Sequence, residues 1–302
     1  MALSVKDWAE AYKIAAHILT GEAHGAIVWD VAVREKFVQW MRANGRSIDH
    51  IRNCVAYLNK YVSRIEGPED IIKIFNQCER GKHHLERALR ALLNYYETAE
   101  GFNREFLDRL RGAIPKVKVG ADLREIDGGQ ILEALKILKG LPGKLSKYYA
   151  LWTLILDSGV RVSHAIYLIN NFDINLVIRL NGFCRYPLGL ERETKHTWFA
   201  YMRMPTLQLV LEAAKLRVTK AGVFRLLSHL REKGVNVVNP KYVRKFAYNK
   251  MLEVGIPESV ADWINGRVPK TIGARHYIWM REQADQYYPR YAAYLNTLLS
   301  GL

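Results

Sequence analysis

Apolar residues recur at helical spacing along most of the chain, and this periodicity constrains the fold more than any other feature of the sequence. A spacing of i, i+3, i+4 and i+7 places apolar side chains on one face of a helix, which then packs against other helices. No strand pattern occurs before residue 112, so we expect this part to be all helix. The pattern predicts helices over residues 5–19, 31–43, 48–65, 71–75, 85–96, 103–110, 128–138, 146–156, 162–169, 206–215, 223–233, 240–253 and 257–265, and from Gly273 onward.

One segment, residues 183–204, departs from the helical pattern. Two short runs rich in aromatic residues, Phe183 to Tyr186 and Trp198 to Tyr201, are typical of strands and are separated by polar residues. This arrangement predicts a β-hairpin. A second interruption lies at residues 112–120, where Pro115 precedes alternating lysine and valine. This stretch is either an extended basic strap that crosses a DNA backbone or an ordinary connection between domains.

The two interruptions define the expected architecture, which is mainly α (α+β). We expect a helical domain over residues 1–112, a linker over residues 113–124, and a mostly helical domain with a small antiparallel sheet over residues 125–302.

The chain is strongly basic, with a formal net charge of +15 and a pI of about 9.7. Residues 1–120 hold 19 Lys and Arg against 15 Asp and Glu, whereas residues 121–302 hold 26 against 15. Such an excess favours a polyanionic partner such as DNA, because each phosphate that a cation neutralises releases a counterion. An anionic membrane surface, or solubility alone, is the alternative explanation of the charge.

The cysteine content and the start of the chain exclude several other classes. The three cysteines form no CxxC pair and no metal-binding spacing, which fits a reducing compartment. No signal peptide pattern and no stretch of about 18 uncharged apolar residues is present. We therefore expect a soluble, cytoplasmic protein that binds no membrane.

The candidate catalytic residues form a set with a characteristic order along the second domain. Each member alone is an ordinary surface residue, and only their order carries information. In sequence they are Arg161 after the Asp157-Ser158-Gly159 turn, Lys195 in the expected hairpin, Lys241 and Arg244 three apart on one helix face, Arg267 after Gly266, and Tyr277.

This order resembles the catalytic domain of tyrosine recombinases, in which Arg, Lys, His-x-x-Arg, Gly-His and Tyr follow one another. It is more similar to the fusellovirus-type archaeal integrases, which have Lys in place of His in the Lys-x-x-Arg box. The resemblance covers about residues 125–285. Ser158 stands where the family usually has Thr, and His164 stands where bacterial members usually have Glu. Residues of the first domain resemble the helical core-binding domain of these enzymes, namely Phe37, Trp40, Met41, Gly45, Ser47, Ile51, Tyr57 and Leu58.

The resemblance assigns a role to each member of the set. Arg161 and Arg244 would clamp the non-bridging oxygens of the attacked phosphate, because guanidinium groups match phosphate oxygens in pairs. Lys241 and Arg267 would add positive charge. Lys195 would protonate the leaving 5′ oxygen, and Tyr277 would form a 3′-phosphotyrosine intermediate. Such an enzyme uses no metal and no nucleotide cofactor, and the sequence contains no GxxxxGK[ST] or HExxH motif.

The expected function is therefore site-specific DNA recombination, that is, integration of an archaeal virus or plasmid. The expected partners are double-stranded DNA attachment sites in the nucleoid, with a homotetramer on DNA and a monomer or weak dimer in its absence. Three alternatives remain open at this point. They are a Xer-like resolvase of chromosome dimers, a type IB topoisomerase-like enzyme, and a DNA-binding protein without catalytic activity.

The end of the chain suggests how protomers would assemble. Four residues after Pro289 fall on one apolar helical face, namely Tyr291, Tyr294, Leu295 and Leu298. This tail helix either packs on its own domain or docks in a groove of a neighbouring protomer. Because Pro289 provides a natural hinge, and because related recombinases exchange such tails, the sequence favours docking on a neighbour.

Overall fold

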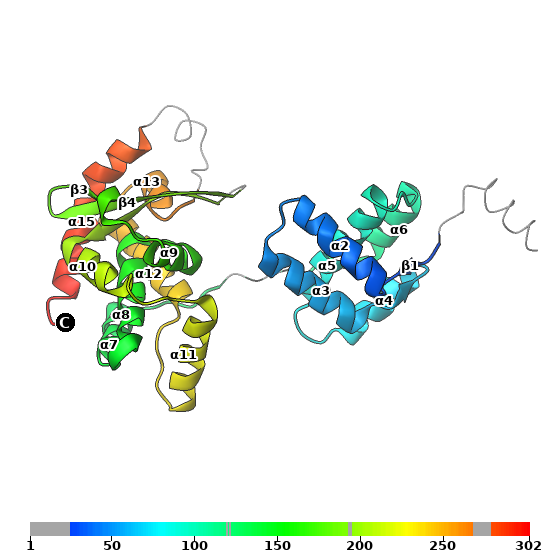
Figure 1. The fold of residues 1–302 in the computed structure, drawn as a ribbon, viewed down its shortest axis with the longest axis horizontal. Coiled ribbons are helices and arrows are strands. Elements are labelled where there is room, and N and C mark those ends of the chain that lie inside the picture. Colours follow the sequence, from blue (N-terminus) through cyan, green and yellow to red (C-terminus); the bar gives the residue numbers. More distant parts are fainter. Residues whose placement is uncertain (1–24, 119, 121, 193–194, 268–278) are drawn as a thin grey trace, which may run out of the picture. The chain divides into compact units, whose positions relative to one another are not determined.

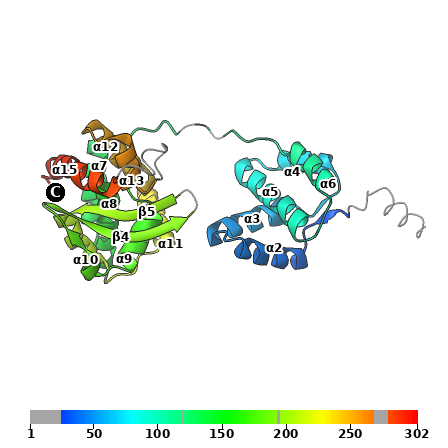
Figure 2. The same cartoon turned by 90° about the horizontal axis from the view of Figure 1, so that it is seen from above.

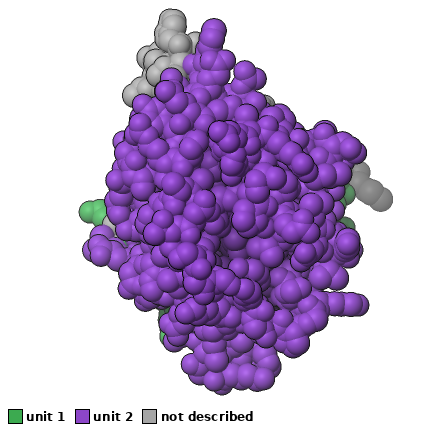
Figure 3. Space-filling model, turned by 90° about the vertical axis from the view of Figure 1, so that its left-hand side faces the viewer, with its two compact units in different colours: residues 1–122 green, residues 123–302 purple. Residues whose placement is uncertain are grey.

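The computed structural model describes residues 25–118, 120, 122–192, 195–267 and 279–302 (Figure 1). The chain divides into two compact units, with the division between Asp122 and Leu123 (Figure 3). We call residues 1–122 unit 1 and residues 123–302 unit 2. The architecture is mainly α with small antiparallel sheets, which confirms the predicted fold class.

Unit 1 is a bundle of helices that pack around a shared apolar core. Helices α3 and α5 make extensive contact, and the Tyr96 hydroxyl of α5 donates to the carbonyl of Val28 at 2.6 Å. The side chains of Phe37, Leu58 and Leu92 are fully buried in this core. The described helices are α2 (Val31–Ala43), α3 (Ile48–Tyr61), α4 (Pro68–Gln77), α5 (Lys82–Thr98) and α6 (Arg104–Ala113).

Two short strands correct the expectation that the first domain is all helix. The helix predicted over residues 48–65 ends at Tyr61, and the next residue, Val62, is extended. Strand β2 (Arg64–Ile65) then pairs antiparallel with β1 (Ile27–Val28). The pairing buries the side chains of Ile27 and Ile65 completely, and β-branched side chains fit a strand better than a helix.

Unit 2 is built around helix α8 (Ser146–Ser158), whose residues from Ala150 onward are buried on all sides. This helix contacts α7, α9, α10, α12 and strand β5, and Figure 2 labels these elements around it. A helix that is apolar all round must lie inside a domain, because it has no face for water. In the described part of the chain, no helix is long and apolar enough to cross a membrane. Around α8 lie α7 (Gly128–Lys139), α9 (Val162–Asn170), α10 (Met204–Ala213), α11 (Lys220–Glu232), α12 (Pro240–Glu253), α13 (Glu258–Ile264) and α15 (Met280–Leu298).

The predicted hairpin is present in unit 2. Strand β4 (Phe183–Arg192) pairs antiparallel with β5 (Lys195–Arg203), and β3 (Ile178–Arg179) adds a third strand beside β4. The register places Tyr186 opposite Ala200, and it shifts between Pro187 and Leu190. Proline lacks the N–H that a regular ladder requires, which is consistent with an irregularity there.

Helix α15 corrects the expectation for the tail. It continues through Pro289 to Leu298, and Tyr291 and Leu295 are fully buried in the core of their own unit. The Tyr291 hydroxyl donates to the carbonyl of Leu156 at 2.8 Å, and the Tyr288 hydroxyl donates to that of Asp157 at 3.2 Å. Proline removes one backbone donor from the helix, and burial of this face in the core of unit 2 outweighs that loss.

Candidate active site

The turn between α8 and α9 presents the first arginine of the ordered set. Gly159 ends α8 with φ of 60°, and a Cβ at this position would lie 2.2 Å from the amide oxygen of Asn265. Only glycine fits both this backbone conformation and this close approach. Arg161 is the residue just before α9, and its Nη1 donates to the carbonyl of Gly266 at 2.7 Å.

Arg244 reaches the same place from helix α12. Its Nη1 donates to the carbonyls of Gly159, at 2.6 Å, and of Asn265, at 2.7 Å. The two arginines are therefore held by three backbone carbonyls from two turns that lie far apart in the sequence. Backbone carbonyls fix a guanidinium in space without neutralising its charge.

The third arginine, Arg267, follows the turn that supplies two of these carbonyls. Its backbone N–H donates to the carbonyl of Asp262 at 2.8 Å, and its guanidinium lies over the ring of Tyr248 at 4.3 Å. Its Nη1 is also 3.3 Å from the carboxylate of Asp262, which is almost fully buried. This ion pair supplies negative charge within the cluster.

The electrostatics of this arginine cluster (Arg161, Arg244 and Arg267) favour an anion. Burial, together with the nearby charges of Arg161 and Arg267, lowers the pKa of Arg244 to about 9. Burial and the charge of Arg267 also lower the pKa of Arg161. After burial, the neighbouring cations are the next cause of both shifts, and a phosphate placed among the three guanidinium groups would offset their repulsion.

Strand β5 packs against the turn that precedes Arg267 through Thr197, a residue that the sequence patterns did not indicate. Gly266 has φ of 67°, and a Cβ there would lie 2.0 Å from the Thr197 hydroxyl oxygen. The same hydroxyl is 2.8 Å from Nδ1 of His164 on α9. Thr197 thus connects the Arg267 turn, helix α9 and the strand that begins with Lys195.

The structure places the other candidates as follows. Lys195 is the first residue of β5 and pairs with Arg192 in the register, but its side chain is not among those described. Lys241 is exposed in the first turn of α12, one turn before Arg244, with its Nζ 5.2 Å from the centroid of the Tyr242 ring. Tyr277 lies outside the described residues. Of the six candidates, the described contacts thus bring Arg161, Arg244 and Arg267 together.

A buried ion pair supports the turn that carries Arg161. Asp157 accepts hydrogen bonds from the backbone N–H of Arg203, at 2.8 Å, and from its Nε and Nη2, at 3.1 and 3.0 Å. Both residues are almost fully buried, and Asp157 also accepts from Tyr288 through its carbonyl. The pair links the end of α8, the end of β5 and helix α15. Nothing in the spacing of Asp157 and Arg203 along the sequence indicates it.

Comparisons with known proteins identify the family and the fold of the chain. Residues 126–294 match the family described as archaeal phage integrase. The Tn1549 transposon integrase, solved in complex with circular intermediate DNA, has a TM-score of 0.53 at 11% identity, over 84% of this chain and 98% of that one. A second structure of the same integrase, in complex with transposon right end DNA, has a TM-score of 0.50 at 12% identity, over 89% of this chain and 99% of that one. No curated protein matches the sequence.

Proposed function

The chain belongs to the archaeal phage integrase family of tyrosine recombinases, and from this premise we propose that it cuts and rejoins DNA with Tyr277 as the nucleophile. The observation that carries the proposal is the arginine cluster, in which backbone carbonyls orient Arg161 and Arg244 while leaving their charges available. Phosphoryl transfer needs cations that are positioned in advance at the oxygens on which charge develops.

The proposed first step is an in-line displacement at a phosphodiester. The Tyr277 oxygen bonds to phosphorus and its phenolic proton passes to solvent, the bond from phosphorus to the 5′ oxygen breaks, and Lys195 donates a proton to that leaving oxygen. Arg161 and Arg244 bind the non-bridging oxygens, and Lys241 and Arg267 add positive charge. Rejoining is the reverse reaction, in which a 5′ hydroxyl attacks the 3′-phosphotyrosine and releases the tyrosine.

The wider proposal concerns the DNA and the assembly. We propose that the chain acts on double-stranded attachment sites during integration of an archaeal virus or plasmid, as a homotetramer on DNA. Unit 1 would serve as the core-binding domain and unit 2 as the catalytic domain. The solved integrase with which the chain shares its fold is bound to DNA ends and to circular intermediate DNA, which supports a DNA partner here.

Covalent trapping on a nicked suicide duplex tests the proposal. The wild-type chain should form a protein–DNA adduct that mass spectrometry maps to Tyr277, and Tyr277→Phe should bind DNA but form no adduct. Tyr287→Phe is the matched control and should form the adduct normally. An adduct that persists in Tyr277→Phe, or that maps to Tyr287, would refute the assignment. Recombination between two cognate sites, as opposed to relaxation of any plasmid, then distinguishes a recombinase from a topoisomerase.

A further inference from the structure

The face of α12 that carries Lys241 and Arg244 continues one turn further, to Tyr248. These three residues stand at positions i, i+3 and i+7, so helical geometry places their side chains on one side of α12. The ring of Tyr248 is half-buried, and the guanidinium carbon of Arg267 lies 4.3 Å from its centroid. The helix that supplies two of the candidate residues therefore also supplies a surface on which a third one rests.

The end of α13 brings Arg267 onto this ring. The N–H of Gly266 donates to the carbonyl of Trp263 at 2.9 Å, and the N–H of Arg267 donates to the carbonyl of Asp262 at 2.8 Å. This pair of hydrogen bonds is a Schellman motif, which reverses the chain at the end of a helix and uses the left-handed backbone of Gly266. The chain therefore turns back beside Asp262, and Nη1 of Arg267 lies 3.3 Å from its carboxylate.

The carboxylate of Asp262 acts on both neighbours of this contact. Burial, followed by the charge of Asp262, raises the pKa of Tyr248 to about 12. The ring of Tyr248 therefore carries no charge at neutral pH, and it adds no anion that would compete with a phosphate. The charge of Asp262 also opposes the fall in the pKa of Arg244 that burial and the other two arginines cause. Asp262 thus favours the charged form of the arginine cluster while it contacts one of its members.

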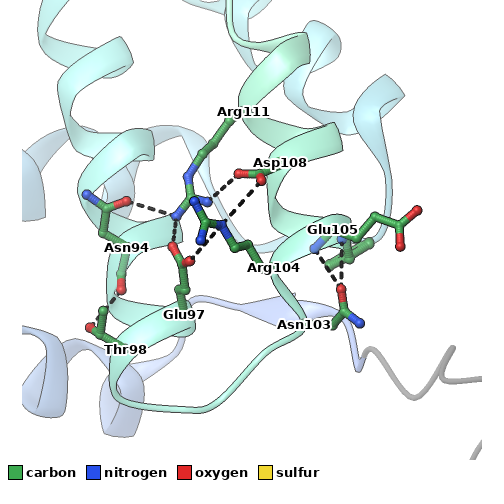
Figure 4. A network of polar contacts seen from close by, with 9 residues as sticks. Asn94, Glu97, Thr98, Asn103, Arg104, Glu105, Asp108 and Arg111 are labelled. Atoms are coloured by element: carbon green, nitrogen blue, oxygen red, sulfur yellow. Dashed lines mark hydrogen bonds and ion pairs between the residues drawn. The ribbon is translucent and has the colours of Figure 1, made fainter.

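An arginine of unit 1 shows how a purely structural arginine differs from Arg267. Arg111 pairs with Asp108 at 2.7 Å and with Glu97, and its Nη2 also donates to Asn94 at 2.9 Å (Figure 4). The side chain of Arg111 is 19% exposed, whereas that of Arg267 is 43% exposed. The described residues restrain one face and one nitrogen of the Arg267 guanidinium, so the rest of this group stays accessible to a phosphate.

We propose that Tyr248 and Asp262 are positioning residues, which hold the guanidinium of Arg267 in the orientation that the cleaved phosphate requires. This inference rests on the proposed function, which supplies the phosphate. It adds two residues that the order of residue types does not indicate. The ring restrains one face of the guanidinium and the carboxylate restrains one end, so the side chain is ordered before the phosphate arrives. A cation that is oriented in advance stabilises the developing charge without a cost of reorganisation during the reaction.

Loss of either contact should slow cleavage without weakening DNA binding. Tyr248→Leu removes the ring and should lower the single-turnover rate about tenfold, whereas Tyr248→Phe keeps the ring and should stay within about threefold of wild type. Asp262→Asn keeps an oxygen for Nη1 but removes the charge, and it should lower the rate about tenfold. Because a negative charge near the cluster is lost, Asp262→Asn should bind DNA at least as tightly as wild type. A merely structural role would lower rate and affinity together.

A double-mutant cycle with Arg267→Ala shows whether the two residues act through that arginine. If they do, Tyr248→Leu and Asp262→Asn should have no further effect in a chain that already carries Arg267→Ala. The full chain is used throughout, with adduct formation on the nicked suicide duplex for the rate and fluorescence anisotropy with a labelled duplex for binding.

Two matched controls should cleave as wild type. Tyr287→Leu removes a half-buried tyrosine of α15 whose ring lies 4.8 Å from the guanidinium carbon of Arg290. Asp108→Asn removes the charge of a carboxylate that pairs with Arg111. Urea unfolding shows that each variant is folded. Asp262→Asn preserves the shape of the side chain, so it keeps the inference testable where Tyr248→Leu is unfolded.

Three outcomes would overturn the inference. They are a Tyr248→Leu variant that cleaves as fast as Tyr248→Phe, an Asp262→Asn variant with the wild-type rate, and effects that multiply with that of Arg267→Ala. The first two need no second substitution, so they decide the question even where Arg267→Ala cleaves too slowly to follow. Wild-type adduct at Tyr277 together with any of these outcomes rejects the positioning role alone, whereas absence of the adduct in wild type rejects the proposed function.

Discussion

Substitution of Gly266 by alanine should impair DNA cleavage far more than folding. The new Cβ would lie 2.0 Å from the Thr197 hydroxyl oxygen, whereas real Cβ contacts stay beyond 3.0 Å, so one of the two segments must move by about 1 Å. The carbonyl of Gly266 accepts the hydrogen bond from Arg161 at 2.7 Å, and a shift of the turn therefore displaces that arginine. A misplacement of about 1 Å in a catalytic group costs about 10²-fold in rate.

The effect on stability should be smaller and can be separated by a control. The left-handed backbone of Gly266 costs alanine about 1–2 kcal/mol. Gly234 has φ of 76°, and no atom lies within 4 Å of the position that a Cβ would take there, so Gly234→Ala meets the same backbone cost without the steric overlap. In urea unfolding, the strained backbone should lower the free energy of unfolding of both variants by a similar amount. The steric overlap should lower that of Gly266→Ala by about 1–3 kcal/mol more.

Single-turnover adduct formation on the nicked suicide duplex is the assay for cleavage. Gly266→Ala should fall about 10²-fold, and Gly234→Ala should match wild type. Adding Thr197→Ala to Gly266→Ala removes the overlapping hydroxyl and should restore most of the rate. The reasoning fails if Gly266→Ala cleaves as well as Gly234→Ala, or if the double variant does not recover.

Three further experiments test other parts of the structure. Arg203→Met leaves Asp157 buried without its partner and should lower the free energy of unfolding by about 3–5 kcal/mol, whereas Asp157→Leu combined with Arg203→Met should recover much of this loss in the same urea titration. Deleting residues 289–302 removes buried side chains of α15 and should leave unit 2 unfolded by circular dichroism; a folded truncation would show that α15 is dispensable to its own core. Lys195→Ala should cleave an ordinary duplex poorly and a duplex with sulfur at the 5′ bridging position well, because a thiolate leaves without a proton; absence of rescue would exclude the general acid role.

The helical periodicity predicts most of the elements, and its failures have local physical causes. The strands β1 and β2 have two residues each, which is too short for any alternating pattern to appear. The sequence favours docking of the tail on a neighbour because Pro289 provides a hinge and related recombinases exchange such tails. In the structure, burial of the tail in its own unit outweighs the hydrogen bond that proline removes.

The candidate site is predictable only as an order of residue types. That order identifies Arg161, Arg244 and Arg267, which the structure brings to one place. The sequence cannot show that backbone carbonyls hold them, since a carbonyl belongs to every residue and has no sequence signature. The sequence also does not predict the roles of Thr197 or of the pair formed by Asp157 and Arg203. Their contacts join segments that only the tertiary fold brings together.

The position of α15 in the chain has a consequence for the order of events during synthesis. The ribosome makes this helix after every other described element, and its Tyr288 and Tyr291 hydroxyls bind the carbonyls of Asp157 and Leu156, immediately before the turn that carries Arg161. A nascent chain that stops short of Tyr291 therefore contains every arginine of the cluster but not the helix that secures it. On the proposed function, we therefore expect that a chain stopped before α15 does not cleave DNA, because it lacks the contacts that hold the turn before Arg161.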